Sequence, residues 1–475
     1  MKLDSNTKPL SFLEKVGYGV GDMASNFYMG FFNIFLLYYY VDVWGISAAG
    51  VATMFLVTKI IDAISDPTMG IIADRTDTKW GKYRPYILWV CVPYALLGYL
   101  LFLGPELSQT GKLVFAYVSY SLIMLAYTAI NVPYSALLAV ISPVSEERTK
   151  ATQYRFIFAS LGTLSVGASA KPLVDWLGGG DELLGFRLTI LLFAVLTIVL
   201  FLFTFFSTKE RVKPKKHETS ISEDAGVLLN NISWIILAIC SILIVVGLVM
   251  RISSTAFFTK YNMAYGDEKV LWWMDRTSLI ITMGFVGQLV GALITPALLK
   301  LSDKRTLMII MNLVFGGSIL ATYFVPVDDY MTTLLLYASG IFAFGVIITL
   351  LFAMYTDCAE FGEWQSGHNS AGLTVSASMF ALKFGSAVGS AIPGYILAWY
   401  GFVKDADQTA TTLEGISISW NIAPAAFFLI AAFLMLFYKL DGKTMDKVER
   451  ELLERRGETV QVQANNENIS DRYMK

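Results

Sequence analysis

Long apolar runs are the feature that most constrains the fold of this chain. A helix needs about 20 apolar residues to cross the hydrocarbon core of a bilayer. Twelve runs approach that length, near residues 18–41, 47–73, 86–104, 113–141, 156–177, 187–206, 232–260, 277–300, 307–326, 332–356, 372–398 and 418–438. They predict an all-α polytopic membrane protein with 12 transmembrane helices.

Composition supports this fold class. The chain of 475 residues is 55% hydrophobic and 16% charged, whereas soluble domains carry about 25% charged residues. Its net charge of -2 does not indicate nucleic-acid binding. The cysteines Cys91, Cys240 and Cys358 lie in or beside expected spans, and their spacing suggests neither a metal site nor a disulfide framework. The polar N-terminus lacks a signal-peptide core, so we expect the first helix to direct insertion.

Basic residues in the short loops predict the orientation. One side of the expected topology carries Arg75, Lys79, Lys82, Arg84, Arg148, Lys150, Lys304, Arg305, a basic cluster at 209–216 and the tail from Lys439 to Arg456. The loops on the other side are poor in Lys and Arg. We therefore expect both termini to be cytoplasmic, in a multi-pass protein of the cell inner membrane.

A polar segment divides the chain into two similar hydrophobic parts. We expect an N-terminal six-helix half at 1–206, a cytoplasmic linker at 207–230, a C-terminal six-helix half at 231–440 and a cytoplasmic tail at 441–475. Two six-helix halves joined in this way are typical of major facilitator transporters, whose substrate site lies between the halves near mid-membrane. Within the tail, TMDKVERELLERR predicts a short surface helix, and the residues after it are expected to be disordered.

Two carboxylates in the second span form the most informative polar feature. Asp62 and Asp66 are four residues apart and share a helix face. Two unpaired carboxylates there would repel each other, and a cation between them would remove the repulsion. Sodium or a proton could do this, with Thr128 or Ser65 adding a neutral oxygen. The alternative is that Asp66 caps or pairs at the helix end, beside Pro67.

Other polar side chains in the spans are functional candidates because an ionisable group in a membrane is costly. Lys383 has no acid on its own helix, so the first-half acids are its expected counter-charge; snorkelling is the alternative. The remaining candidates are Asp22, Asn26, Lys59, Asn131, Arg155, Lys171 and Arg251. Interfacial placement is the alternative for Arg155 and Lys171. Aromatic residues near them, Tyr18, Tyr127 and Tyr134, are suited to sugar stacking or to ordinary packing.

Motifs of enzymes and ATP-driven pumps are missing from the sequence. It contains no Walker loop, G-x-S-x-G or H-E-x-x-H, and its two histidines, His217 and His368, fall in expected cytoplasmic segments. We therefore expect a transporter without a cofactor other than a coupling ion.

Several segments together resemble the glycoside-pentoside-hexuronide:cation symporter family of the major facilitator superfamily. They are YGVGD, YYYVDVWGIS, DAISDPTMG, WGKYRPYIL, AYTAINVPYSAL, RFIFASLG, DCAEFGEW and ALKFGSA. The resemblance implies cation-coupled sugar import by alternating access. It implies cation binding by Asp62, Asp66 and Thr128, a coupling role for Lys383, and sugar contacts by Arg155 and Tyr127. It also implies that Asp357, Glu360 and Glu363 form a cytoplasmic gate through charged contacts between the halves.

The chain departs from the galactoside-transporting members of this family. Asn26 and Asn131 stand where those members have aspartates that hold sugar hydroxyls, and Ser135 replaces a tryptophan. Ser65 replaces an asparagine of the sodium site, which leaves Na+ and H+ both open as the coupling ion. Asp22, one turn from Asn26, is expected to contribute to the sugar site.

The loss of carboxylates and the presence of Arg251 and Lys171 suggest an acidic sugar. Our hypothesis is a uronic acid or uronide, and the alternative is a neutral pentoside such as a xyloside. Two other classes remain open, a lysolipid-type carrier and a sugar sensor that does not transport. Expected partners are a small sugar and the lipid bilayer, with a monomeric protein.

Overall fold

The computed structural model describes residues 9–142, 144–211, 228, 230–263, 269–271, 273–367, 371–404 and 406–455. The first half contains α1 (Phe12–Phe31), the π-helical segments η1 (Phe32–Leu36) and η2 (Tyr39–Val43), α2 (Ala48–Arg75), α3 (Arg84–Leu101), α4 (Gln109–Ile141), α5 (Ser145–Gly178) and α6 (Glu182–Ser207). The second half contains α8 (Ile232–Phe257), η3 (Phe258–Asn262), α9 (Arg276–Leu298), α10 (Lys304–Tyr323), α11 (Tyr330–Ser366), α12 (Ala371–Trp399), α13 (Ala410–Ser417), η4 (Ile418–Ile422) and α14 (Ala423–Met435). Helix α15 (Gly442–Arg455) follows.

All the expected apolar runs are helical. Among the described residues, eleven helices are long and apolar enough to cross a membrane. The remaining run lies in 12–43, where α1, η1 and η2 form one continuous helical segment. Its composition is more polar because it includes Asp22 and Asn26, and it packs against α5 and α6. The prediction of a 12-helix major facilitator fold is confirmed.

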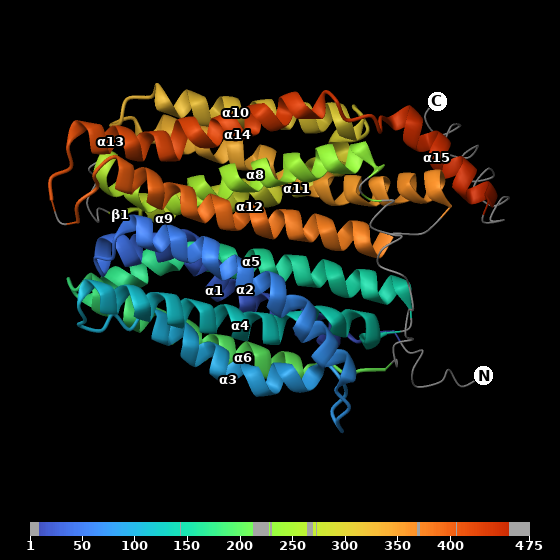
Figure 1. Ribbon diagram of the computed structural model, residues 1–475, viewed down its shortest axis with the longest axis horizontal. Coiled ribbons are helices and arrows are strands. Elements are labelled where there is room, and N and C mark those ends of the chain that lie inside the picture. The colour runs from blue at the N-terminus through green and yellow to red at the C-terminus, as the bar shows by residue number, and fades with distance from the viewer. Residues whose placement is uncertain are drawn as a thin grey trace.

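The helices form two bundles (Figure 1). In the first, α1 packs on α5 and α6, and α4 packs on α2 and α3; in the second, α8 packs on α12 and α14, and α11 packs on α9 and α10. Contacts between the bundles come mainly from α2 with α12, α5 with α9, and η1 with α8. We call the end of the molecule that carries α15 the terminal end, and the opposite end, beside α13 and the strands, the distal end.

Aromatic side chains fill the core of each half. In the first half the ring of Phe31 lies 5.1 Å from Phe102 and 5.9 Å from Phe186, both edge-on. In the second half the rings of Phe315 and Phe428 lie 4.1 Å apart. Aromatic pairs of this kind stabilise a fold by more than the burial of their apolar area alone. These contacts therefore stabilise the core of each bundle.

The two halves also repeat a helix-capping interaction at the terminal end. Arg84, the first residue of α3, donates a 2.7 Å hydrogen bond to the carbonyl of Phe205 near the end of α6. Arg305, at the start of α10, donates to the carbonyl of Leu436 just after α14. The last carbonyls of a helix have no partner within it, and cations there also favour the helix dipole. Arg84 and Arg305, which were used to predict the membrane orientation, therefore also cap the C-terminal ends of α6 and α14.

The structure adds two features to the predicted all-α fold. A short antiparallel hairpin pairs β1 (Lys269–Leu271) with β2 (Met274–Asp275) before α9. Three helices also change to π-helical geometry, in η1 with η2, in η3 and in η4. Such segments are frequent at functional sites.

The tail contains the predicted surface helix, α15, which runs from Gly442 to Arg455. It packs on the end of α11, where Trp364 donates a 2.7 Å hydrogen bond to Glu451. Most of the predicted linker, and the tail beyond Arg455, lie outside the described residues.

Candidate functional site

The predicted cation residues come together between α2 and α4. Asp66 accepts a 2.8 Å hydrogen bond from the hydroxyl of Thr128. Ser65 lies 3.4 Å from both the Thr128 hydroxyl and the backbone carbonyl of Asp62. Asp62 lies one turn before Asp66 on the same helix. The side-chain oxygens of Ser65, Asp66 and Thr128 therefore come together from two helices of one half, with the Asp62 carboxylate one helical turn away.

Each of the two carboxylates also holds a lysine. Lys59, three residues before Asp62, forms a 2.7 Å ion pair with its Oδ2 atom. Lys383 on α12 forms an ion pair with Oδ2 of Asp66, and this contact joins the two halves. The predicted counter-charge for Lys383 is thus present. The sequence analysis assigned no role to Lys59. Its position three residues before Asp62 was nevertheless a signal that the two side chains form an ion pair.

One oxygen of this cluster is available to a ligand. Oδ1 of Asp62 is buried and has no hydrogen-bond partner. A buried unsatisfied carboxylate oxygen is costly unless something binds it. Hard monovalent cations and protons both suit an all-oxygen set of two carboxylates and two hydroxyls, so the residues present fit the coupling ion expected from the sequence.

Two of the predicted sugar residues, Asp22 and Arg155, form a second cluster with Tyr134 and Tyr18. Nε of Arg155 lies 3.1 Å from Oδ2 of Asp22, which joins α5 to α1. The guanidinium also lies over the ring of Tyr134, 5.1 Å from its centroid, and that ring stacks on Tyr18 at 4.9 Å. The hydroxyl of Tyr18 is buried without a hydrogen-bond partner. Both tyrosine rings are fully buried, so in this conformation the cluster combines aromatic and polar groups without an open sugar-binding surface.

Asn131 links the two clusters because α4 carries both. It is three residues after Thr128, so the two side chains are neighbours on one helix face. Its amide nitrogen donates a 2.9 Å hydrogen bond to the hydroxyl of Tyr127, and its buried Oδ1 has no partner. Across on α1, Asn26 accepts a 3.3 Å hydrogen bond from Thr163. A hydroxyl donor from a sugar would satisfy Asn131.

Arg251 does not join either cluster. It is 1% exposed within the second half. Its Nη1 donates a 3.2 Å hydrogen bond to the carbonyl of Trp420 in η4, and its guanidinium stacks 4.2 Å from the Trp420 ring centroid and 5.1 Å from that of Tyr337. The aromatic rings and a helix carbonyl thus take the place that the sequence hypothesis assigned to a sugar carboxylate.

Lys171 also lies outside both clusters. It forms an ion pair with Asp175 one turn later on α5 and lies 3.6 Å from Glu182 at the start of α6. These contacts belong to the distal end, where Lys171 stabilises the turn between two helices. The two cations behind the acidic-sugar hypothesis therefore have partners elsewhere.

The predicted cytoplasmic gate residues lie on the terminal part of α11. Asp357 accepts hydrogen bonds of 2.7 and 2.8 Å from Lys304 on α10, which belongs to the same half. Glu360 and Glu363 follow on the same helix. The contact of Asp357 between halves that the resemblance implied is therefore replaced, in this conformation, by one within the second half.

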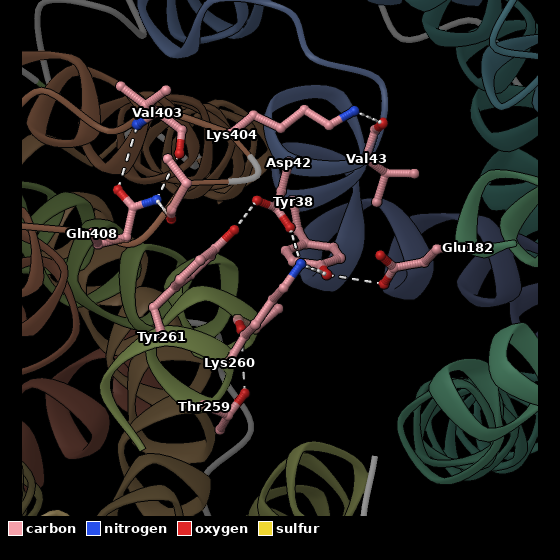
Figure 2. A network of polar contacts seen from close by, with 12 residues as sticks. Tyr38, Asp42, Val43, Glu182, Thr259, Lys260, Tyr261, Val403, Lys404 and Gln408 are labelled. Atoms are coloured by element: carbon pink, nitrogen blue, oxygen red, sulfur yellow. Dashed lines mark hydrogen bonds and ion pairs between the residues drawn. The ribbon is translucent and has the colours of Figure 1, made fainter. Parts of the chain in front are cut away.

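A polar network at the distal end joins the halves, and sequence reasoning missed it (Figure 2). The buried carboxylate of Asp42 in η2 accepts hydrogen bonds from Lys260 and Tyr261 in η3. The ammonium of Lys260 also donates a 3.0 Å hydrogen bond to the hydroxyl of Tyr38. Lys404 donates a 2.5 Å hydrogen bond to the carbonyl of Val43. The sequence did contain a signal for this network: Asp42 and Lys260 lie at the ends of the first apolar run of each half.

Known proteins share sequence similarity with almost the whole chain. Residues 17–442 match the family described as MFS/sugar transport protein. The chain is 32% identical to the inner membrane symporter YicJ of Escherichia coli (strain K12), over 93% of this chain and 95% of that protein. It is 33% identical to the isoprimeverose transporter of Lactiplantibacillus pentosus, over 93% and 90%. It is 28% identical to the glucuronide carrier protein homolog of Escherichia coli (strain K12), over 93% and 96%.

The match includes both clusters and all the predicted site residues. It runs from the second turn of α1 to the first residue of α15. The relatives are similar over almost their whole length and are transporters. The chain belongs to the glycoside-pentoside-hexuronide:cation symporter family of the major facilitator superfamily.

Proposed function

We propose that this protein imports a neutral glycoside together with a monovalent cation, Na+ or H+, by alternating access. The observation that carries the proposal is the position of Asp66. Its carboxylate contacts Thr128 of its own half and Lys383 of the other half. A cation bound at this carboxylate competes with Lys383, so ion binding changes an interaction between the halves and shifts their equilibrium.

Coupling to the sugar follows from the shared helix α4. Thr128 contacts the cation cluster and Asn131 faces the sugar cluster three residues later. An ion that orders this stretch of α4 also orders the sugar contacts. Thermodynamic linkage makes the effect reciprocal, so each ligand raises the affinity for the other by the same factor.

Charge pairing at mid-membrane favours a neutral sugar over a uronide. Each candidate cation there has its own carboxylate, in the pairs Lys59 with Asp62, Lys383 with Asp66 and Arg155 with Asp22. Paired charges exert little net attraction on a sugar carboxylate. Because Arg251 and Lys171 have partners elsewhere, the neutral alternative replaces our acidic-sugar hypothesis. The chain is also somewhat more similar to the isoprimeverose transporter, at 33% identity, than to the glucuronide carrier protein homolog, at 28%.

The same proposal assigns an orientation. We place the terminal end in the cytoplasm because the basic loops and α15 lie there. The distal network then closes the outward pathway, and the structure corresponds to a state closed toward the outside. The protein acts as a monomer in the cell inner membrane under this proposal.

Uptake into proteoliposomes tests the function. We expect a neutral xyloside to accumulate under an imposed Na+ or H+ gradient, and Asp62→Asn to abolish accumulation while exchange of sugar down its gradient survives. Absence of cation-driven accumulation by the unmodified protein would refute symport and favour a sensor or a lysolipid-type carrier. Accumulation of a glucuronide that the xyloside does not inhibit would restore the acidic-sugar hypothesis.

A further inference from the structure

The cation cluster contains two lysines. Lys59 belongs to the same half as the two carboxylates, and Lys383 belongs to the other half. Lys59 and Asp62 lie on the same helix, three residues apart, with Nζ 2.7 Å from the carboxylate. Lys383 reaches Asp66 from α12 in the other half. A rocking motion of the halves can separate Lys383 from Asp66, but it leaves Lys59 beside Asp62. Lys59 is therefore a fixed charge of the cation site.

Counting charges shows what this fixed lysine does. Asp62 and Asp66 together contribute two negative charges, and Lys59 cancels one of them. The remaining single negative charge is balanced by Lys383 in the state seen here. When Lys383 leaves, one monovalent cation restores neutrality. The neighbouring pair of Asp22 and Arg155 is neutral by itself and does not alter the count.

The net charge of the cluster affects cation binding because part of the cluster is buried. The side chains of Asp62 and Lys59 are 9% and 22% exposed, whereas those of Asp66 and Lys383 are 25% and 49% exposed. The Asp62 end of the cluster is therefore its buried part. Unbalanced charge in such a place is strongly disfavoured because little water solvates it. The occupancy of the site should thus follow its net charge. Without Lys59, the two carboxylates would need two positive charges.

We propose that Lys59 sets the coupling stoichiometry of this transporter at one monovalent cation per sugar, by acting as a permanent counter-charge to Asp62. The proposal rests on the symport function proposed above and goes further, because it assigns the stoichiometry to a residue outside the predicted site. Lys59 is a positioning residue in this scheme: it acts through Asp62 and does not contact the sugar.

Equilibrium accumulation measures the stoichiometry directly. With the membrane potential clamped at zero, the inside-to-outside sugar ratio equals the cation ratio raised to the number of cations per sugar. A tenfold gradient of the driving cation therefore gives about tenfold accumulation for one cation and about a hundredfold for two. We expect about tenfold accumulation for the unmodified protein and for Lys59→Arg, and about a hundredfold for Lys59→Gln. An unchanged tenfold ratio in Lys59→Gln would overturn the proposal.

A charge-balanced double variant provides an independent test, which also covers the case in which Lys59→Gln fails to fold. Asp62→Asn alone leaves Lys59 and Asp66, which cancel, so coupling should be lost. Adding Lys59→Gln to Asp62→Asn restores one negative charge and should restore cation-driven accumulation. A double variant that folds and binds sugar but stays uncoupled would contradict the charge count. Cation-independent uptake by the unmodified protein would instead refute the proposed function itself.

Discussion

Asp42 and Lys260 form an ion pair between the two halves, and they lie in η2 and η3, the π-helical ends of the first helix of each half. The carboxylate of Asp42 has no exposed surface, whereas the Lys260 side chain is 41% exposed. Tyr261 donates a second hydrogen bond to the same carboxylate (Figure 2). One buried acid therefore accepts two of the polar contacts that join the halves at the distal end.

Asp42→Asn should weaken closure of the distal end. Hydrogen bonds to a charged group contribute about 1.5–3 kcal/mol, so losing the charge should shift the equilibrium between the two states about tenfold or more toward outward opening. A reporter at Ser253→Cys, next to the inter-half surface formed by Phe32 and Ser390, should react faster with an impermeant maleimide. The three native cysteines are buried, which keeps the background low.

Asp181→Asn is the matched control for this experiment. Asp181 lies at the same end but caps α6, where it accepts a hydrogen bond from the backbone of Leu184. It should leave the reactivity of the reporter unchanged. Equal reactivity of the Asp42→Asn variant and the parent would show that the network does not hold the distal end closed.

Glu147, at the terminal end, should make the thermal stability of the protein depend on pH. A hydrogen bond from Lys15 lowers the pKa of Glu147 from 4.5 to about 2, and Lys150 and the backbone of Leu10 add to it. Because the folded-state pKa is lowered, the stabilisation is present above pH 4.5 and is lost as the pH falls toward 2. Glu147→Gln should thus lower the melting temperature at pH 7, and its difference from the parent should shrink below pH 4.

Glu106→Gln serves as the comparison, because Glu106 is an exposed acid in the loop before α4. Thermal unfolding in detergent across pH 3–7 should leave its melting curve close to that of the parent. A Glu147→Gln difference that is constant over this pH range would mean that the ion pairs with Lys15 and Lys150 do not stabilise the protein.

The fold was predictable because its main signal is local. Each apolar run identified a helix, and α8 begins at the expected residue, Ile232. Hydropathy identifies the apolar part of a helix and not its polar extension. For this reason the prediction ended this span at residue 356, whereas α11 extends ten residues further, to Ser366. Hydropathy gave no signal for the π-helical segments; one of them, η4, contains Trp420, whose carbonyl accepts a hydrogen bond from Arg251, 169 positions away in the chain.

The candidate site was predictable where partners are near in sequence or have few competitors. The spacing of Asp62 and Asp66 and the isolation of Lys383 led to the observed cluster. Arg251 and Lys171 show the limit of the argument that a charge in a span is functional. A carbonyl and two aromatic rings contact Arg251, whose buried Nε has no hydrogen-bond partner, and nearby acids pair with Lys171. Sequence alone does not reveal which partner a long side chain reaches.

Asn131 should contribute directly to sugar affinity. Its buried Oδ1 lacks a partner, and a sugar hydroxyl donating to it is worth about 1 kcal/mol, or somewhat less than tenfold in affinity. Asn131→Leu should therefore raise the KM for a neutral glycoside severalfold, with cation-driven accumulation retained. Tyr127→Phe, which removes only the hydroxyl that accepts from the Asn131 amide, should have a smaller effect. An unchanged KM in Asn131→Leu would exclude this contact.

Arg251 offers the sharpest distinction between a structural and a recognition role. Arg251→Met keeps much of the buried volume but leaves the carbonyl of Trp420 without its donor, which costs about 1–3 kcal/mol. We expect a melting temperature lower by several degrees and an unchanged ratio of xyloside to glucuronide uptake. Arg251→Lys should be destabilised less, because an ammonium can still reach the carbonyl but stacks less well on Trp420 and Tyr337. A selective loss of glucuronide uptake in both variants would mean that Arg251 contacts the substrate in another state.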